Sequence, residues 1–516
     1  MPVCVAEFSA SSRRFIIMNK PLQLSKSQYL KGSQCPLSLW YALYRRDLKP
    51  VLDPTREALI KAGREVGDWA KKRFPGGIEV KAAFFDTPAG AAETKAHIDA
   101  GNNILFEATA VHPGDGSHAR ADIFQKVPEA DAWDLIEVKG TTGVDDYHID
   151  DLAFQYRVFT AAGYRINRCV IMHINNQYTR QGEIDPQALF MTEDVTDAVM
   201  DRLADEERAV PELLALAEAQ EPQVRIGARC GKPFDCNYVH HCWRGVPEYS
   251  IFDVLTVKKA EEMVESLGSY EVKSLPAKAH PTGLKKADVW SYLNGQIYIE
   301  PENIRQFLGN IQYPLYFLDY ETVRHPVPLF DGARPFQQIP FQFSLHIEET
   351  PGAKLQHHSF LHQERSDPRP GFVERLLEVC GTAGTVIVYN QMFEEGVNEA
   401  LAAFIPAKSG ELLAINARMI DLLDPFKKRW IYHPSQNSSA SIKKVLPAFT
   451  KLTYDGMGIT NGDAASQLYL GFVKGGLAAD ITEQFWKDLH EYCHLDTYAM
   501  KILLDELKRK NESGAT

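Results

Sequence analysis

The segment CGKPFDCNYVHHC, residues 230–242, contains three cysteines with five residues between successive thiols. A fourth cysteine lies nearly two hundred residues earlier, just before the aromatic-rich, helix-like segment PLSLWY. Four thiolates are the ligands that a [4Fe–4S] cluster needs, one for each iron. The expected ligands are Cys35, Cys230, Cys236 and Cys242. Such a cluster would hold both ends of the intervening chain together, so this spacing predicts that residues 1–245 fold as one unit.

A structural zinc site is the alternative that these cysteines leave open. Thiolates bind zinc as well, and His240 and His241 lie directly before Cys242. Zinc sites usually contain cysteine pairs separated by two to four residues. The sequence contains no such pair, so the spacing favours the iron–sulfur cluster.

The composition is that of an ordinary globular protein. Of the 516 residues 45% are hydrophobic and 24% are charged, and no apolar run approaches the roughly 20 residues of a membrane helix. The start of the chain, MPVCVAEFSASSRRFIIMNK, lacks the long apolar run of a signal peptide. Eight cysteines without regular pairing indicate a reducing compartment, so we expect a cytoplasmic protein without a membrane partner. The net charge of −12 argues against a general nucleic-acid coat protein, but not against a nuclease, whose metal sites consist of carboxylates.

The pattern of apolar residues divides the chain into three parts. Residues 1–245 alternate strand-like and helix-like runs, which is typical of an α/β domain. The expected strands are Ile104–Val111, Ala121–Gln125, Trp133–Val138 and Arg168–Ile174, and the expected helices are Asp150–Ala162 and Glu193–Ala219. Residues 246–310 resemble a connector of short helices. Residues 311–516 show a second α/β pattern, which begins with the buried strand LYFLD and ends with a helix near residues 484–510.

Asp122, Glu137 and Lys139 form the first group of residues suited to metal chemistry. Asp122 lies in the strand-like run RADIF, and the other two lie in LIEVKG fifteen residues later. Residues two apart on a strand share a face, so Glu137 and Lys139 lie side by side. The two carboxylates would bind Mg²⁺ or Mn²⁺, and the lysine would polarise water or neutralise a phosphate. A buried ion pair without catalytic function is the alternative.

This group resembles the active site of PD-(D/E)XK nucleases of the RecB type. The resemblance covers Asp122, the Glu-Val-Lys run that ends at Lys139, and Gln155 on the following helix. It implies a restriction-endonuclease-like fold, metal ligation by Asp122 and Glu137, and catalytic roles for Lys139 and Gln155.

The cysteines that bracket this core resemble the iron–sulfur subclass of these nucleases, found in CRISPR-associated adaptation nucleases and in the AddB helicase–nuclease. One cysteine precedes the core and three follow it, as in this chain. Two features depart from the pattern: Phe159 stands where relatives carry a tyrosine, and the segment GREVGDWA lacks their metal-binding histidine. Glu65, Asp68 and Glu107 are therefore the candidates for a third metal ligand.

A second group of acids lies in residues 311–516. Asp319 and Glu321 in YFLDYET are two apart on an apolar strand, and Tyr492 and Asp496 are one helical turn apart. Glu394 follows another buried strand. Acids that converge from a strand, a second element and a C-terminal helix suit a two-metal phosphodiesterase. The alternative is that these acids only cap a strand end and an exposed helix.

The second group resembles the DEDD exonucleases of the ribonuclease H-like fold, in their tyrosine-bearing form. Asp319 and Glu321 match the first motif, and Tyr492 and Asp496 match the third. The second motif, Asn-x-x-x-Asp in the relatives, here begins at Asn390 and ends with Glu394. The resemblance implies metal ligation by Asp319, Glu321, Glu394 and Asp496. It also implies that Tyr492 orients the attacking water, with Asp421 as an accessory ligand or a helix cap.

The whole chain resembles an uncharacterised bacterial family that fuses an iron–sulfur RecB-like nuclease to a DEDD-like domain. We therefore expect a metal-dependent nuclease that hydrolyses the phosphodiester bonds of DNA, with Mg²⁺ or Mn²⁺ at two active sites and one [4Fe–4S] cluster. Two alternatives stay open: a cluster-stabilised nucleic-acid-binding scaffold with a degenerate second site, and an RNA 3′-exonuclease.

Overall fold

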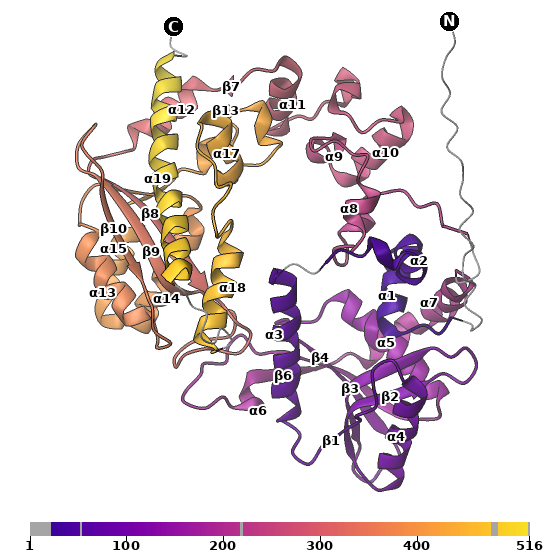
Figure 1. Ribbon diagram of the computed structural model, residues 1–516. Coiled ribbons are helices and arrows are strands. Elements are labelled where there is room, and N and C mark those ends of the chain that lie inside the picture. Colours follow the sequence, from indigo (N-terminus) through magenta and orange to yellow (C-terminus); the bar gives the residue numbers. More distant parts are fainter. Residues whose placement is uncertain (1–21, 52–53, 217–219, 476–482, 514–516) are drawn as a thin grey trace, which may run out of the picture.

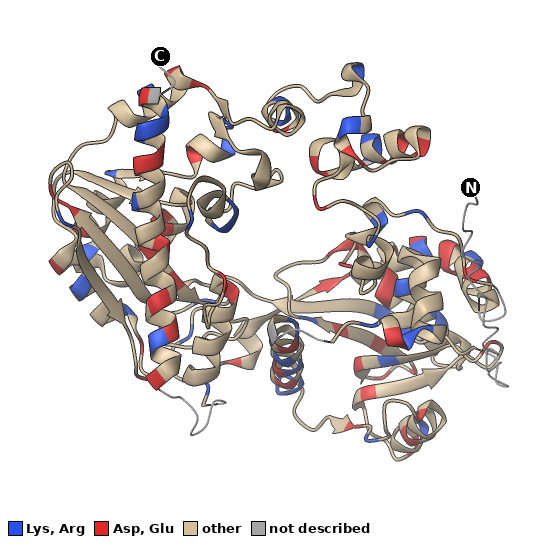
Figure 2. Cartoon of the chain, turned by 45° about the horizontal axis from the view of Figure 1, so that its top comes forward, with Lys and Arg blue, Asp and Glu red and all other residues tan. Residues whose placement is uncertain are grey.

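The computed structural model describes residues 22–51, 54–216, 220–475 and 483–513. The chain forms two lobes, each built on its own β-sheet, and a helical connector links them (Figure 1). Acidic and basic residues are interspersed along the chain in both lobes (Figure 2). Among the described residues, no helix combines the length and the apolar character needed to cross a lipid bilayer. The N-terminal segment that bears on the signal-peptide prediction lies outside these residues.

The first lobe contains a six-stranded sheet in the order β1-β2-β3-β4-β5-β6. Its strands are β1 (Ile78–Glu79), β2 (Ile104–Val111), β3 (His118–Lys126), β4 (Trp133–Lys139), β5 (Ile166–Ile174) and β6 (Phe190–Asp194). The pairs β1–β2 and β4–β5 are parallel and the other neighbours are antiparallel. Its helices are α1 (Lys26–Gln34), α2 (Pro36–Tyr44), α3 (Pro54–Lys71), α4 (Thr87–Asp99), α5 (Asp146–Ala161), α6 (Pro186–Leu189), α7 (Thr196–Ala215) and α8 (Val239–Cys242).

Helix α5 is the helix that brings functional side chains to this sheet. Its start is fixed by Asp145, whose backbone N–H donates to Nδ1 of His148 (3.0 Å). Phe154 and Phe159 on one face of the helix pack with Phe124 of β3 in the core of the lobe. Burial of these rings holds the helix at a fixed position over the sheet.

The second lobe contains a five-stranded mixed sheet in the order β10-β9-β8-β11-β12. Its strands are β8 (Leu315–Val323), β9 (Ile339–Glu348), β10 (Gln356–Leu361), β11 (Thr385–Val388) and β12 (Met419–Asp421). The first three strands form antiparallel pairs, whereas β11 runs parallel to both β8 and β12. Its helices are α13 (Arg369–Val379), α14 (Gln391–Phe404), α15 (Ser409–Asn416), α16 (Asp424–Lys427), α17 (Ile442–Phe449), α18 (Gly462–Val473) and α19 (Glu483–Ser513).

Alternate residues of β8 face opposite sides of this sheet. Tyr316 and Leu318 belong to the apolar cluster that contains α13, α14 and α15 side chains. Leu315 and Phe317 belong to the cluster that contains α18 and α19 side chains. The same alternation places Asp319 and Glu321 on the side of the sheet that α19 covers (Figure 1).

The connector contains α9 (Ile251–Val254), α10 (Val257–Leu267), α11 (Lys285–Asn294), β7 (Tyr298–Ile299) and α12 (Pro301–Gly309). Its second half is built into the second lobe. Strand β7 pairs with β13 (Ile431–Tyr432), and the fully buried carboxylate of Asp288 accepts a hydrogen bond from Nε of Arg429 (2.6 Å). The predicted short helices of the connector are therefore present, together with a strand that the sequence did not indicate.

The two lobes also touch through a loop from each sheet. The backbone N–H of Arg180 donates to the carbonyl of Ala333 (3.0 Å), and the N–H of Gly332 donates to the carbonyl of Arg180 (2.8 Å). The guanidinium of Arg180 reaches the carbonyl of Leu329 (2.7 Å). Nearby, Glu65 of α3 forms an ion pair with Lys474. These contacts join the lobes at a point far along the chain from the connector.

The α/β architecture predicted for both halves of the chain is confirmed. The strand Ile104–Val111 agrees with the prediction, and the other predicted strands appear with slightly longer bounds. The expected helix from Glu193 instead begins at Thr196, because residues 190–194 form the edge strand β6. Strand β10, also at an edge, was not predicted because its sequence QHHSFL is polar and lacks alternation.

Candidate functional site

The four predicted cluster ligands line one small pocket of the first lobe. Cys35 lies between α1 and α2, and the three later cysteines lie in and before α8. The amide of Gln34 donates to the carbonyls of Arg229 and Phe234 (2.7 and 2.6 Å), which fastens α1 to the three-cysteine segment. The structure therefore brings together thiols that lie nearly two hundred residues apart in the sequence.

Four thiols are a donor set that both an iron–sulfur cluster and a zinc ion accept. Burial, and after it the neighbouring thiols of Cys236, Cys230 and Cys35, together raise the pKa of Cys242 to about 11. Zinc–thiolate bonds of about 2.3 Å would place four sulfurs about 3.8 Å apart. Among the described residues, the metal-ligand groups whose atoms lie within 4.8 Å of one another include none of these cysteines. His240 and His241 do not line the described pocket.

The first acidic cluster lies where β3, β4 and α5 meet. Glu137 accepts hydrogen bonds from Nζ of Lys139 (2.8 Å) and from the amide of Gln155 (2.7 Å). One carboxylate oxygen of Asp122 accepts from the backbone N–H of Val138 (2.7 Å), which places Asp122 beside Glu137. Thus the structure gathers all four residues that the sequence predicted for this site.

Two further residues of this cluster were not predicted. Asp151 of α5 accepts from Nζ of Lys139 (2.5 Å) and lies one helical turn before Gln155. Lys26 at the start of α1 donates to Glu137 (2.8 Å) and lies 3.3 Å from Asp151. The signal for Asp151 was its four-residue spacing from Gln155, which puts both on one helix face. No local signal marked Lys26, because α1 reaches the site only through the tertiary fold.

Of the candidates for a third ligand, Glu65 and Asp68 lie on α3, and Glu107 lies on β2 between the residue pairs that flank Asp122 of β3. Glu65 pairs with Lys474 of the second lobe and lies 3.5 Å from His325. Asp68 is exposed on α3, and Glu107 lies 3.7 Å from Lys71. Asp151, which was not among these candidates, is a further carboxylate that contacts both Lys26 and Lys139.

The charges of the first cluster do not balance. Three carboxylates face two ammonium groups, so one negative charge remains in excess. Burial and then the charge of Glu137 raise the pKa of Asp122 to about 7. Burial alone would also raise the pKa of Glu137, but Lys139 and Lys26 outweigh it and lower that pKa. A bound divalent cation would compensate the excess charge.

The second acidic cluster lies between β8 and α19. Ligand atoms of Asp319, Glu321 and Cys493 lie within 4.8 Å of one another. Tyr454 donates its hydroxyl proton to the carboxylate of Asp496 (2.6 Å). Asp319, Glu321 and Asp496 therefore meet as predicted, and the thiol of Cys493, which was not among the predicted site residues, lies 3.6 Å from Asp319.

Glu394 completes this group of acids. It lies in the first turn of α14 with 2% of its surface exposed, and its Oε2 atom has no hydrogen-bond partner among the described residues. Burial raises its pKa to about 8. Its charge also contributes to the raised pKa of Asp319, whose largest causes are burial and Asp496. The glutamate in place of the expected aspartate thus faces the same site.

Asp421 has a structural role instead of a ligand role. Its carboxylate accepts hydrogen bonds from the backbone N–H groups of Asn390 (3.0 Å), Gln391 (3.1 Å) and Leu423 (2.9 Å). These bonds hold the turn between β11 and α14, where Asn390 adopts a φ of 112°. Asp421 therefore positions the helix that carries Glu394.

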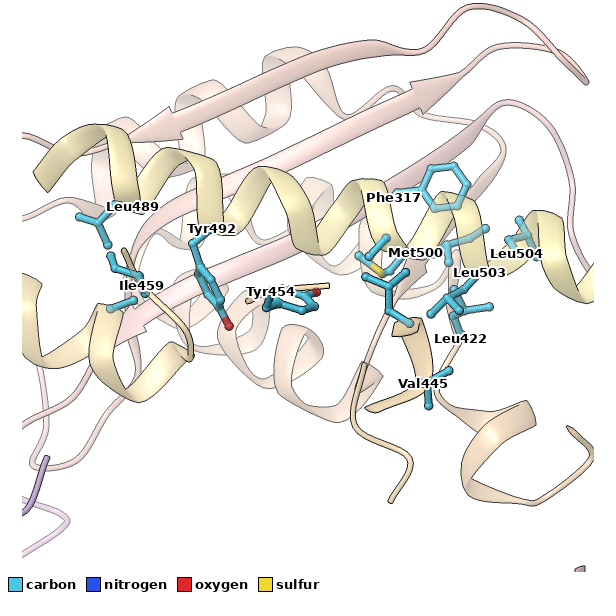
Figure 3. Packing of buried hydrophobic residues seen from close by; sticks show 14 of the residues in the cluster. Phe317, Leu422, Val445, Tyr454, Ile459, Leu489, Tyr492, Met500, Leu503 and Leu504 are labelled. Carbon is cyan, nitrogen blue, oxygen red and sulfur yellow. The ribbon is translucent and has the colours of Figure 1, made fainter. Parts of the chain in front are cut away.

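Two tyrosines and a lysine border the second cluster. Figure 3 shows the rings of Tyr454 and Tyr492 side by side below α19. Lys443 lies over both rings, 5.6 and 5.1 Å from their centres. Burial, then Asp496 and Glu321, raise the pKa of Tyr492, so this hydroxyl stays protonated. Lys443 lowers the pKa of Glu321, although burial and Asp496 keep that pKa well above its ordinary value.

Comparisons with known proteins give similarity over parts of the chain. A family model described as a domain of unknown function (DUF2779) matches residues 316–441, which include β8 and α14. An uncharacterized protein of Mycoplasma pneumoniae, named as an MG366 homolog, is 27% identical over 36% of this chain and 30% of its own length. The uncharacterized protein UU173 of Ureaplasma parvum is 28% identical over 43% of this chain and 36% of its own length. The chain thus spans about a third of the length of these curated relatives.

Proposed function

We propose that this protein is a metal-dependent nuclease that hydrolyses phosphodiester bonds of DNA at two active sites. The observation that carries the proposal is the meeting of four acids from three elements in the second lobe, three of them buried and Asp319 half-buried. They are Asp319 and Glu321 of β8, Glu394 of α14 and Asp496 of α19. Buried carboxylates that raise one another's pKa are costly unless cations bind them. A five-stranded mixed sheet with acids on its central strand supports a ribonuclease H-like domain of the DEDD type.

The chemistry follows from the groups around these acids. Two divalent ions about 4 Å apart, when bound, supply an activated water and stabilise the leaving oxygen. Tyr492 keeps its proton and lies beside Asp496, so its hydroxyl can hold the attacking water in line. Lys443 brings a positive charge to the same side for a substrate phosphate. Cys493 contributes a soft donor beside Asp319 that the DEDD pattern does not require.

The first lobe supports a second active site of the PD-(D/E)XK type. Asp122 and Glu137 are the metal ligands, and Asp151 adds a third carboxylate. Gln155 holds Glu137 in place through its amide. Lys139 lies between Glu137 and Asp151, where it can neutralise a phosphate once a metal ion takes over part of the carboxylate charge.

The pocket of four cysteines supports a [4Fe–4S] cluster in the same lobe. Bound there, it would fasten α1, which carries Lys26 close to the first acidic cluster, to the segment before the connector. We assign the cluster a structural role. A cytoplasmic location follows from the reduced state that such a cluster and the unpaired cysteines require.

The test is degradation of end-labelled DNA by protein purified without oxygen, with Mg²⁺ or Mn²⁺ and with a chelator as the control. Matched single-stranded DNA, double-stranded DNA and RNA oligonucleotides identify the substrate. Asp319→Asn and Asp122→Asn inactivate the two sites separately, and the double variant should lose all cleavage. Asp131→Asn is the matched control, because this aspartate is exposed and lies away from both clusters.

Each other outcome has a definite meaning. Binding of DNA without metal-dependent cleavage would overturn the proposal in favour of the scaffold alternative. Trimming of RNA but not of DNA would mean that RNA is the substrate, as in the RNA 3′-exonuclease alternative. Cleavage lost only in Asp122→Asn would leave one active site and make the second lobe degenerate.

A further inference from the structure

Three histidines of the second lobe meet on the far side of α19 from the acidic cluster. His346 of β9 and His357 of β10 are direct partners in the antiparallel pairing of these strands. His494 of α19 closes the group, with ring centres 4.7 Å from His346 and 4.5 Å from His357. One ring nitrogen of each histidine lies within 4.8 Å of the other two. Neither acidic cluster uses these side chains.

Hydrogen bonds to hydroxyl groups hold two of the three rings in place. Thr497 donates its hydroxyl proton to the carbonyl of His494 (3.1 Å), so its oxygen accepts from Nδ1 of His346 (2.8 Å) and from Ser344 (2.7 Å). Ser344 in turn accepts from Nε2 of His357 (3.0 Å). This arrangement leaves Nε2 of His346 and Nδ1 of His357 without a proton. Hydroxyl groups that fix the tautomer in this way are typical of histidines that bind metals.

The rings are also held in the neutral form that a metal ion needs. Burial, and after it the neighbouring His357 and His494, together lower the pKa of His346 to about 3. Burial and then His494 lower the pKa of His357 to about 4. No carboxylate contributes to either shift. Burial and then His490 lower the pKa of His494, although the nearby Glu491 raises it. Neutral imidazoles select a borderline transition metal over Mg²⁺ or Ca²⁺.

We propose that His346, His357 and His494 bind one divalent transition-metal ion, with Zn²⁺ as the best match. Three nitrogen ligands with a fourth position open to water are a common zinc arrangement. Tetrahedral zinc with bonds of about 2.0–2.1 Å needs nitrogens about 3.4 Å apart, so the site closes slightly on binding. His346 is buried and the other two are half-buried, which gives an ion access from the β10 side.

The position of this site gives it a consequence for α19. The same helix turns Cys493 toward Asp319 and His494 toward the two strand histidines. A metal ion bound by His494 would fix the rotation of α19 over the sheet. The proposed zinc ion therefore acts as a structural clamp on the helix that carries Tyr492 and Asp496.

The test measures Zn²⁺ binding to the full-length, iron-loaded protein by calorimetry, with excess Mg²⁺ to fill the carboxylate sites. One tight Zn²⁺ per chain is expected, and His357→Ala and His494→Ala should each weaken it by about 10-fold or more. His358→Ala is the matched control, because His358 is the neighbour of His357 on the opposite face of β10 and should leave binding unchanged. Thr497→Val should weaken binding by about 10- to 100-fold while keeping all three ligands.

The alternatives are separable. Co²⁺ in place of Zn²⁺ reports its ligands by visible absorption, since thiolates add intense charge-transfer bands that imidazoles lack. Zinc that stays after His357→Ala and leaves after Cys236→Ala belongs to the cysteine pocket and overturns the proposal. Zinc that leaves after Asp319→Asn belongs to the acidic cluster and overturns it as well. DNA cleavage is measured separately, so a negative result here leaves the nuclease proposal standing.

Discussion

Buried carboxyl groups in the two lobes are neutralised by different means. In the first lobe Glu137 is paired with Lys26 and Lys139. In the second lobe Asp319 and Asp496 have hydroxyl, thiol and carboxyl neighbours. At the scale of single residues, this difference decides which acids stay ionised without metal and which take up protons.

Asp122→Asn should remove metal-dependent cleavage in the first lobe without unfolding it. The pKa of Asp122 lies near 7, so the neutral amide resembles a form that the native protein already adopts. Its oxygen can still accept from Val138, and Lys26 and Lys139 keep their partners. Three measurements check this: DNA cleavage by Asp122→Asn combined with Asp319→Asn, compared with Asp319→Asn alone, and the iron content and thermal unfolding of Asp122→Asn. A large loss of stability would favour a purely structural ion-pair cluster.

Without metal, the protein should lose stability as the pH rises from about 4.5 to about 8. The pKa of Glu394 is about 8 in the folded state against about 4.3 in an unfolded chain, so the folded state binds more protons in this window. In Glu394→Gln the free energy of unfolding should therefore fall less with pH, by roughly 3–5 kcal/mol over the whole window. Thermal unfolding in a chelator measures it. Mn²⁺ should also flatten the slope, because it binds the ionised acids; an unchanged slope would contradict metal binding.

Single residues of both sites were predictable where a strand or a helix carried the spacing. Asp319 with Glu321, and Glu137 with Lys139, are two apart on apolar strands, and the face they share follows from the pleat alone. Lys26 could not be predicted from the sequence, because its place beside Glu137 depends on how α1 packs against α5. His346 and His357 were missed because strand β10 was not predicted, so their pairing had no basis.

At the scale of elements, α19 is the helix on which the second lobe depends. Leu503 and Leu504 at one end and Leu489 at the other are fully buried against the sheet and its neighbours (Figure 3). Between these apolar anchors the helix carries the polar residues of two sites. This packing at both ends explains why a 31-residue helix keeps a fixed position over strands that are no more than ten residues long.

Tyr492→Phe should slow trimming of DNA ends while sparing metal binding. The hydroxyl lies beside Asp496, but it is not among the acids that would hold the ions. A loss of about 10- to 100-fold is expected if it orients water, in the range of a positioned proton donor or acceptor. Single-turnover rates and Mn²⁺ titration separate the two effects. Tyr454→Phe is the comparison, since this hydroxyl is already committed to Asp496.

Gly384→Ala should destabilise the second lobe through the pairing of β11 with β8. Gly384 has a φ of 83°, and an added Cβ would overlap the carbonyl oxygen of Pro314 at the start of β8. We expect a cost of about 3 kcal/mol or more, since strain of about 1–2 kcal/mol adds to the overlap. Gly352→Ala, with a φ of 77° and open space around it, should show only the strain. Equal shifts in melting temperature would contradict this account.

At the scale of the whole molecule, the cysteine pocket closes the first lobe. Cys35 and Cys230 bring the two ends of the lobe together, and Cys242 lies directly before the connector. The connector in turn is anchored to the second lobe by the buried pair of Asp288 and Arg429. Among the described residues, the connector is therefore attached at one end to the cysteine pocket of the first lobe and at the other end to the second lobe.

Cys236→Ala should remove the cluster and destabilise the first lobe by about 5 kcal/mol, by analogy with a covalent link that closes a loop of this length. Protein purified without oxygen should contain about four irons and four sulfides per chain, and the variant should contain neither. Cys169→Ala is the control, because Cys169 is buried in the same lobe away from the pocket. Stoichiometric zinc without acid-labile sulfide would contradict the cluster.

The contact between the lobes has a consequence for how this protein can vary in evolution. Arg180, Gly332 and Ala333 meet through main-chain hydrogen bonds, which every residue with an N–H and a carbonyl can make. The residue types are restricted as well, because Gly332 has a φ of 70° and the guanidinium of Arg180 binds the carbonyl of Leu329. An insertion or a deletion moves the bonding groups out of alignment. The number of residues between β5 and α6, and between β8 and β9, should thus be kept among close relatives, together with Arg180 and Gly332. Surface loops ordinarily show the opposite behaviour and change their length freely.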